Sequence, residues 1–159
     1  MAPRFERQSG FTLVEIILVI VLGGILAAIA GSRFFNLLNF QSRGFFDQAV
    51  AATRFAQKYA VASGCNIRVR FSAAGFSLTR TGTCQGLAFG PAVPSPSDGG
   101  AFSESPPSGV AVGSADLYFD AAGRPRDPAT GNLLASATNI SIGSRTLRIE
   151  PESGFVHQP

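Results

Sequence analysis

The chain has 159 residues, of which 45% are hydrophobic and 14% charged, and its formal net charge is +3. This length fits one small domain joined to an apolar segment. No basic run of five or more residues occurs, so the composition gives no sign of a nucleic-acid-binding protein.

The first ten residues carry Arg4, Glu6 and Arg7 and end at Gly10, and we interpret residues 1–10 as a cleavable leader. Residues 11–30 are almost wholly apolar. At ~1.5 Å per residue they would span about 30 Å, enough to cross a bilayer core. The preceding arginines favour a cytoplasmic N-terminus, with the C-terminal part in the periplasm.

Glu15 interrupts this apolar stretch. A carboxylate at the centre of a membrane helix costs about 2.5–3.5 kcal/mol, and less near an end, so it usually has a function. Two simpler interpretations are a secretory signal peptide cleaved after Ala28-Ile29-Ala30 and a plain membrane anchor. Neither of them needs Glu15.

Gly10, Phe11 and Glu15 stand where the type IV pilin and type II secretion pseudopilin superfamily has its prepilin signature, and the segment resembles that family. The resemblance implies that a prepilin peptidase cleaves after Gly10 and methylates the new amine of Phe11. It also implies that Glu15 pairs with the N-terminal amine of a neighbouring subunit during assembly. A buried carboxylate needs such a partner. The family's frequent proline near Gly31 is absent, so a kink there stays open.

Helical spacing continues after Ala30 and predicts one long helix from Phe11 to about Ser63, capped by Gly64. Residues 31–64 form its amphipathic, periplasmic half. The first half must be buried by membrane or by other subunits. We expect an aromatic stripe to pack on the sheet, and it consists of Phe45, Phe46, Phe55 and Tyr59. The positions at helical spacing are Phe34, Leu37, Leu38, Gln41, Phe45, Ala51, Phe55, Tyr59 and Ala62.

Alternation of Ile67, Val69 and Phe71 with arginines predicts a half-buried strand, which turns over residues 72–75 and returns over 76–79. With the hairpin tip at Ala74-Gly75, Arg80 would oppose Val69 on the apolar face. That placement is unfavourable, and a bulge, fraying of the hairpin or a longer tip would relieve it.

The same register places Cys65 opposite Cys84. In a periplasmic domain the two cysteines are expected to form a disulfide. Closing a loop of this length stabilises a fold by roughly 3 kcal/mol in the chain-entropy model.

Residues 65–159 are expected to form an antiparallel sheet domain with a Pro/Ser/Gly-rich surface loop at 86–109. The fold class is therefore α+β, a pilin-like fold with a long N-terminal transmembrane helix packed on the sheet. Further strands are predicted at 110–112, 116–119, 139–142 and 145–150, with turns at 120–125 and 151–154 and a short return at 155–156.

This element order resembles the H-type pseudopilin and FimT-like minor-pilin branch, and residues 44–65 look most like the C-type minor pilin of the mannose-sensitive haemagglutinin (MSHA) pilus. The resemblance implies a non-catalytic subunit that assembles or primes a filament and serves adhesion. Implied partners are other pilins, the prepilin peptidase, the inner-membrane assembly platform and membrane lipid. An H-type pseudopilin of a type II secretion system and a DNA-uptake FimT-like pilin remain alternatives.

Catalytic chemistry finds no support in the sequence. His157 is the only histidine and is interpreted as a solvated tail residue. The serines lack an activating partner. Asp116, Asp120 and Asp127 surround a turn, but their spacing matches no calcium loop and the arginines between them repel a cation. No enzyme activity, cofactor or metal is expected.

Arginines offer the one possible DNA contact, through Arg68, Arg70, Arg124 and Arg126. DNA-binding FimT-like pilins use an arginine in the C-terminal tail, and residues 154–159 contain none. DNA is therefore an unlikely partner.

Overall fold

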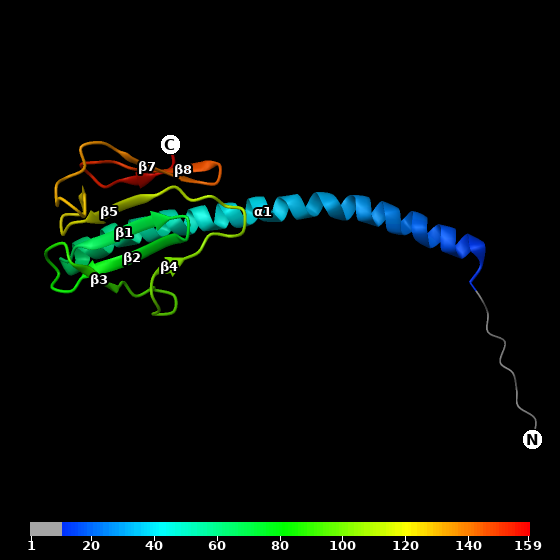
Figure 1. Ribbon diagram of the computed structural model, residues 1–159, viewed down its shortest axis with the longest axis horizontal. Coiled ribbons are helices and arrows are strands. Elements are labelled where there is room, and N and C mark those ends of the chain that lie inside the picture. Colours follow the sequence, from blue (N-terminus) through cyan, green and yellow to red (C-terminus); the bar gives the residue numbers. More distant parts are fainter. Residues whose placement is uncertain (1–10) are drawn as a thin grey trace, which may run out of the picture. The chain divides into compact units, whose positions relative to one another are not determined.

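The computed structural model describes residues 11–159, apart from the side chains of residues 29–38. The leader, the cleavage position at Gly10 and the side chains of Phe34, Leu37 and Leu38 lie outside the described residues. The chain divides into two units, residues 1–39 and 40–159. The elements, shown in Figure 1, are α1 (Leu13–Ser63), β1 (Ile67–Ser72), β2 (Gly75–Thr81), β3 (Phe89–Ala92), β4 (Ser103–Glu104), β5 (Ala115–Phe119), β6 (Pro125–Arg126), β7 (Thr138–Ile142), β8 (Arg145–Ile149) and β9 (Val156–His157). The predicted α+β class is confirmed.

Helix α1 ends where the sequence predicts. It is continuous through Gly31 and Gly44 and stops at Ser63. Gly64 follows with φ of +69°, and its N–H donates to the carbonyl of Ala60 over 2.9 Å. Glycine adopts this left-handed conformation without the steric penalty of a Cβ atom, so it caps the helix.

The buried face of α1 is made mainly of alanine. Ala49, Ala52, Ala56 and Ala60 are fully buried at the three- and four-residue spacing of one helix face, and their small side chains let the strands approach closely. Phe45 and Phe46 are buried as predicted. Phe55 and Tyr59 are half-buried and pack against the same core, as the aromatic stripe predicts, whereas Ala51 and Ala62 are exposed.

The first sheet has the order β3-β2-β1-β5-β6, with β4 paired to β2, and its pairings are antiparallel. Its inner face packs on α1 (Figure 1) and contributes to the hydrophobic core. The predicted inward residues of β1 are all buried, and they share the core with residues of β2 and β5; these are Ile67, Val69, Phe71, Leu78, Leu117 and Phe119.

The predicted hairpin register was wrong by two residues. Ile67 pairs with Arg80 and Ser72 with Gly75, so the turn lies at Ala73-Ala74. Gly75 is part of the strand because it packs against β4, where a Cβ atom would overlap the carbonyl oxygen of Glu104. In the observed register Val69 faces Leu78, and the unfavourable Val69–Arg80 pair does not form.

The segment 86–109 is not only a surface loop. It contributes β3 and β4, which both pair with β2, and its Val93 is fully buried. The ring of Phe102 packs 5.4 Å from Phe55 and 6.2 Å from Phe76. The predicted strand at 110–112 is also wrong, since only Val112 makes an isolated bridge, to Ile142.

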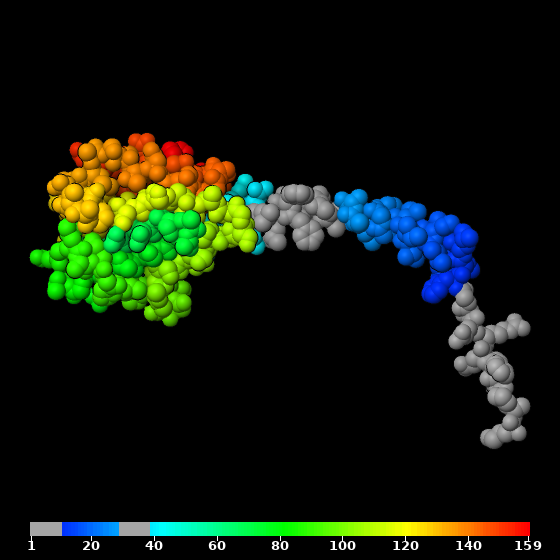
Figure 2. All heavy atoms as spheres, viewed as in Figure 1, coloured from blue at the N-terminus to red at the C-terminus, as the bar shows by residue number. Residues whose placement is uncertain are grey.

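Strands β7-β8-β9 form a separate antiparallel sheet, although the sequence predicted one sheet. Their inward residues Ile140, Ile142, Leu147, Ile149 and Val156 are buried in the common core. On the face seen in Figure 2, these C-terminal residues (orange to red) and the segment containing β2 to β4 (green) lie on either side of the yellow stretch between them.

Candidate assembly site

Thr12 directly precedes Leu13, the first residue of helix α1. The Thr12 carbonyl oxygen accepts hydrogen bonds from the backbone N–H groups of Glu15 and Ile16 at 3.1 and 3.3 Å, and its Oγ1 accepts the same Glu15 N–H at 3.3 Å. Thr12 is therefore the N-cap, and Glu15 stands three residues later, as in a capping box. A carboxylate in the first turn also complements the helix dipole. This local role was missed at the sequence level, although Thr-x-x-Glu is its signal.

The side chains from Phe11 to Ala28 are all exposed. The Phe11 ring is 81% exposed, and a shallow hollow of about 240 Å³ lies beside Glu15 between Phe11, Ile16 and Val19. Among the described residues, no cation forms an ion pair with Glu15. A contiguous apolar surface of this kind marks a contact with lipid or protein.

No helix within the residues whose side chains are described, 11–28 and 39–159, is both long and apolar enough to cross a membrane.

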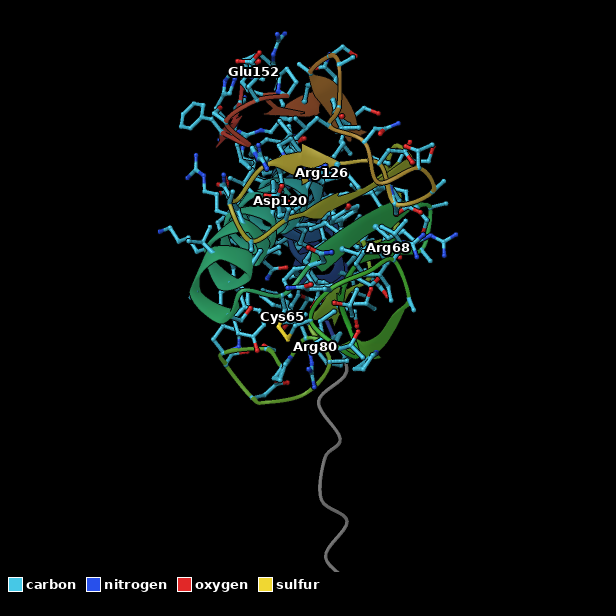
Figure 3. All side chains as sticks on the ribbon, turned by 90° about the vertical axis from the view of Figure 1, so that its left-hand side faces the viewer. Cys65, Arg68, Arg80, Asp120, Arg126 and Glu152 are labelled. Atoms are coloured by element: carbon cyan, nitrogen blue, oxygen red, sulfur yellow. A yellow bond between two sulfur atoms is a disulfide. The ribbon has the colours of Figure 1, made fainter. Side chains whose placement is uncertain are left out.

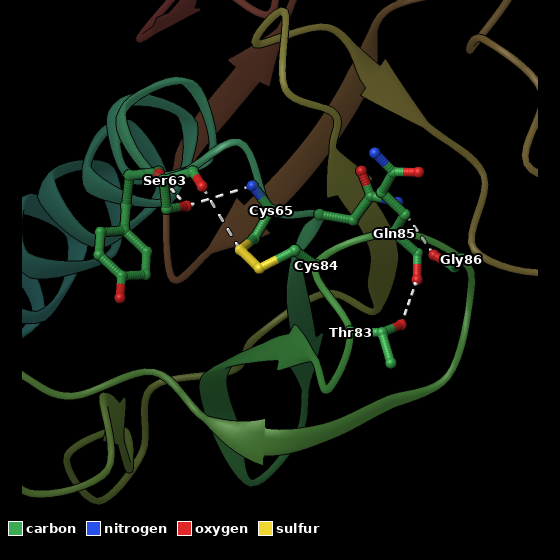
Figure 4. Close-up of a disulfide and its surroundings, with 8 residues drawn as sticks. Ser63, Cys65, Thr83, Cys84, Gln85 and Gly86 are labelled. Atoms are coloured by element: carbon green, nitrogen blue, oxygen red, sulfur yellow. Dashed lines mark hydrogen bonds between the residues drawn. A yellow bond between two sulfur atoms is a disulfide. The ribbon is translucent and has the colours of Figure 1, made fainter.

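The predicted disulfide between Cys65 and Cys84 is present (Figure 4). Although the hairpin register differs from the predicted one, Gly82 and Thr83 continue the chain past β2 and bring Cys84 back to Cys65. Backbone hydrogen bonds fix this return, from Asn66 N to the Cys84 carbonyl at 2.9 Å and from Thr81 N to the Asn66 carbonyl at 3.2 Å. The disulfide therefore ties the end of α1 to the open end of the hairpin.

Arg68 forms an ion pair on the outer face of the sheet. Its Nε donates to Asp116 Oδ1 at 2.6 Å and its Nη2 to Asp116 Oδ2, and its guanidinium lies 5.5 Å from the centroid of the Phe89 ring. The hydrogen bond to Asp116 raises the pKa of Arg68, partly opposed by burial.

Asp120 organises the turn after β5. Its Oδ1 accepts the N–H groups of Ala122 and Arg124 at 2.9 and 3.0 Å. Its Oδ2 accepts Arg126 Nε at 2.7 Å and lies 3.1 Å from Arg124 Nη2, and Figure 3 shows Asp120 and Arg126 together. Burial by itself raises the pKa of Asp120, but the hydrogen bonds from Arg126, Arg124 and the backbone outweigh it and lower that pKa.

These ion pairs engage three of the four arginines considered for DNA. Arg68 is held by Asp116, and Arg124 and Arg126 share Asp120. Arg70 is exposed, and the structure gives it no ion pair with any described residue. The arrangement is that of structural ion pairs more than of a free basic surface, and DNA contact remains only a prediction.

Two polar residues of α1 connect the helix to the turn between β5 and β6 and to the second sheet, and neither was anticipated. Gln57 Nε2 donates to the carbonyl of Gly123 at 3.0 Å and to that of Ser153 at 2.8 Å. Arg54 donates through Nε and Nη2 to the Val156 carbonyl at 3.1 and 2.9 Å. Their partners lie 66 to 102 residues away along the chain, so no local pattern reveals them.

His157 is not a solvated tail residue as predicted. It is half-buried, its Nε2 lies 3.0 Å from Glu150 Oε1, and its ring stacks 5.1 Å from Phe155. The hydrogen bonds from His157 and from Arg148 lower the pKa of Glu150.

Comparison with known proteins relates this chain to pilins. The prokaryotic N-terminal methylation motif matches residues 6–31. The type IV narrow pilus major component PilA5 of Thermus thermophilus is 46% identical over 57 residues, which are 36% of this chain and 47% of the relative. The chain thus matches about half the length of that relative. The type IV minor pilin FimU of Pseudomonas aeruginosa aligns with a TM-score of 0.48 and 15% identity over 74% of this chain and 91% of FimU.

Proposed function

We propose that this chain, which carries the N-terminal methylation motif and is 46% identical to a type IV pilin over 57 residues, is a non-catalytic minor pilin of an MSHA-like type IV pilus. It would be held by residues 11–30 in the inner membrane, with its sheet domain in the periplasm, and would then pass into the filament. The motif and the partial similarity to a type IV pilin support the pilin class, and the resemblance of residues 44–65 supports the MSHA-like assignment.

Glu15 is the observation that carries the proposal. Its carboxylate lies among exposed apolar side chains, next to the position that cleavage would make the N-terminus, and has no ion-pair partner among the described residues. Once a neighbouring subunit buries this surface, the carboxylate needs a cation. The freed amine of Phe11 on that neighbour supplies it. Glu15 thus acts as the assembly residue, and Gly10 and Phe11 as the processing residues.

Partners follow from this role. A prepilin peptidase would cleave after Gly10 and methylate Phe11, an inner-membrane platform would extract the subunit, and other pilins would bury residues 11–28. The sheet domain would face outward and contribute to filament priming and adhesion.

A substitution of Glu15 tests the role. Glu15→Ala should be processed and inserted but should be lost from the sheared filament fraction, because its apolar surface no longer presents a carboxylate to the incoming amine. Asp47→Ala, which removes an exposed carboxylate further along α1, should assemble normally. Normal incorporation of Glu15→Ala would disprove the assembly role.

Deleting the gene separates the filament systems. Loss of surface pili and of adhesion with normal release of exoproteins supports the minor pilin. Loss of exoprotein release supports the pseudopilin alternative, and loss of DNA uptake alone supports the DNA-uptake alternative.

A further inference from the structure

A pocket of about 380 Å³ lies at the end of the sheet domain where α1 stops. Gly64, which directly follows the helix, forms part of its wall, together with Asn66, Gln85 and residues of the turn after β5. The pocket shares no residue with the apolar surface of residues 11–28 that the proposed filament buries. We name it the Arg124 pocket.

The charged groups of the Arg124 pocket leave one positive charge in excess. Among the described residues that line it, only Arg124, Arg126 and Asp120 are charged. The Asp120 carboxylate already accepts four N–H groups, from the backbone of Ala122 and Arg124 and from the two guanidiniums. This is about the full capacity of a carboxylate, so Asp120 offers a ligand no further acceptor.

Both guanidiniums keep free N–H groups while they are held in place. Arg126 donates through Nε to Asp120 and through Nη1 to the Gly131 carbonyl, and Arg124 contacts Asp120 through Nε and Nη2. No described residue accepts a hydrogen bond from Arg124 Nη1 or Arg126 Nη2. The two side chains are 45% and 24% exposed, so a ligand can reach them. A fixed guanidinium suits a carboxylate, whose two oxygens accept parallel hydrogen bonds.

Two amides add hydrogen-bonding groups of both kinds. Asn66 directly follows Cys65 and Gln85 directly follows Cys84, so the disulfide fixes the chain beside both amides (Figure 4). Asn66 Nδ2 donates to the Gly86 carbonyl at 2.9 Å, which leaves its Oδ1 without a donor among the described residues. The Gln85 side chain has no hydrogen bond to any described residue. A hydroxyl group suits these amides, because it can both donate and accept.

The backbone beside Gln85 is strained. Within the described part of the chain, Cys84 is the one residue other than glycine with a positive φ, 63°. This conformation is unfavourable for a residue that carries a Cβ atom, and such strain is common at functional sites. The strained residue sets the direction in which the chain enters Gln85, and the disulfide holds it there.

We propose that the Arg124 pocket binds a sugar acid of the hexuronic acid class. Its carboxylate neutralises the excess charge and pairs with the free N–H groups of Arg124 and Arg126. Its hydroxyl groups pair with the amides of Asn66 and Gln85. A phosphate dianion brings no donor for Asn66 Oδ1, and an acidic protein side chain brings no hydroxyl groups beside its carboxylate, so neither uses both sets of groups. The use of this site in adhesion to an acidic polysaccharide rests on the proposed function.

Binding of glucuronate to the full-length chain in detergent tests the site, and a titration followed by saturation-transfer NMR measures the affinity. Glucose has a similar ring without the carboxylate, and acetate has the carboxylate without the hydroxyl groups. Glucuronate should bind about tenfold more tightly than either, or better, because it alone uses the guanidiniums and the amides together.

Two variants separate the two parts of the site. Arg124→Gln should weaken the binding of glucuronate and of acetate about tenfold and leave that of glucose unchanged. Gln85→Ala should weaken the binding of glucuronate and leave that of acetate unchanged, and it removes no hydrogen bond within the described structure. Arg70→Gln, which removes an exposed arginine outside the pocket, should change none of these affinities. Thermal unfolding checks that each variant is folded.

Absent binding of glucuronate, or equal binding of glucuronate and glucose, would overturn the proposal. Acetate that binds as tightly as glucuronate would make the pocket a simple anion site. A short aspartate-containing peptide that binds more tightly than glucuronate would assign the pocket to a protein partner. Either result would overturn the choice of a sugar acid.

Failure of the filament role is measured separately, by processing at Phe11 and by assembly of the Glu15→Ala variant. Glu15→Ala should bind glucuronate as the parent does. A chain that is processed and assembles normally but binds no glucuronate contradicts this inference alone.

Discussion

Gly154 lies at the point where two turns of the domain meet. Its φ is +66°, and a Cβ atom there would overlap the Gly123 carbonyl oxygen and come within 2.7 Å of Gln57 Nε2. Gly154→Ala should therefore lower the free energy of unfolding by about 2 kcal/mol or more, through both backbone strain and the clash. Urea unfolding of the full chain in detergent measures this loss.

Gly99 provides the matched control, since it has a similar φ of +72° but a Cβ atom there would meet nothing within 4 Å. Gly99→Ala should cost only the strain, about 1 kcal/mol. An equal loss of unfolding free energy in Gly154→Ala and Gly99→Ala would show that the close packing of Gly154 against the Gly123 turn contributes nothing to stability.

Asp120 makes the stability of the domain dependent on pH. Its pKa is lowered in the folded state by Arg126, Arg124 and the backbone amides, against the effect of burial. Its contribution is therefore fully present above the ordinary carboxyl pKa of about 4 and is lost as the pH falls through the lower folded-state value. Asp120→Asn should reduce the loss of stability between pH 5 and about pH 2, measured by thermal unfolding. Asp47→Asn, which changes an exposed carboxylate of α1, should leave this loss of stability unchanged. Equal acid sensitivity of Asp120→Asn and the parent would contradict the role of Asp120.

A residue's role can be predicted from the sequence only where a local pattern defines it. Gly10, Phe11 and Glu15 lie in the methylation motif, and their processing and assembly roles stay predictions. The cap at Gly64, which ends a long helical pattern, is confirmed. Gln57 carries no comparable signal, because it becomes important only when the turns at Gly123 and Ser153 reach it. The two arginines on Asp120 were noted in the sequence as repelling a metal ion, and the structure shows that they pair with the same carboxylate.

At the scale of the elements, the Gln57 amide joins α1 to the two turns that contain Gly123 and Ser153. Gln57→Ala leaves the carbonyls of Gly123 and Ser153 without this donor, and we expect a loss of about 1–2 kcal/mol. Gln57→Glu should lose more, because a carboxylate would face two carbonyl oxygens. Lys58→Ala, at the exposed neighbouring position, should be nearly neutral. Urea unfolding compares the three variants, and a Gln57→Glu variant as stable as the parent would contradict the bridging role.

The disulfide joins α1 to the first hairpin. Cys65 and Cys84 are separated by 19 residues, and opening a loop of this size should cost roughly 3 kcal/mol. Replacing both cysteines by serine should lower the midpoint of thermal unfolding, and a reductant should lower it in the parent but not in the variant. A parent protein whose unfolding is insensitive to reductant would show that the disulfide adds no stability.

The elements that the sequence predicted correctly have strong local signals. The helix has its apolar period and its glycine cap, and β1 alternates between buried and polar residues. The predicted hairpin register was wrong because Gly75 packs closely against the backbone of Glu104, which lies well outside the hairpin. Strands β3 and β4 were missed because the Pro- and Gly-rich composition of 86–109 resembles that of a loop, and only pairing with β2 makes them strands.

At the scale of the whole molecule, each unit has a different kind of surface. Residues 40–159 bury a common core of α1 and two sheets, whereas residues 11–28 expose large apolar side chains throughout. The apolar run that begins at Phe11 predicted the apolar surface, whereas the domain boundaries assigned from the sequence stay a prediction. The split into two sheets was not predictable, because it depends on contacts between the strands after residue 110 and α1.

The central claim is that this chain is matured as a pilin, and the intact mass of the mature protein tests it most directly. We predict that the protein isolated from its native envelope begins at Phe11, carries one added methyl group on the Phe11 amine and retains the disulfide. A mature protein that begins after Ala30 would make it a secreted domain, and an unprocessed N-terminus would leave it a plain anchor. Either result would contradict the account.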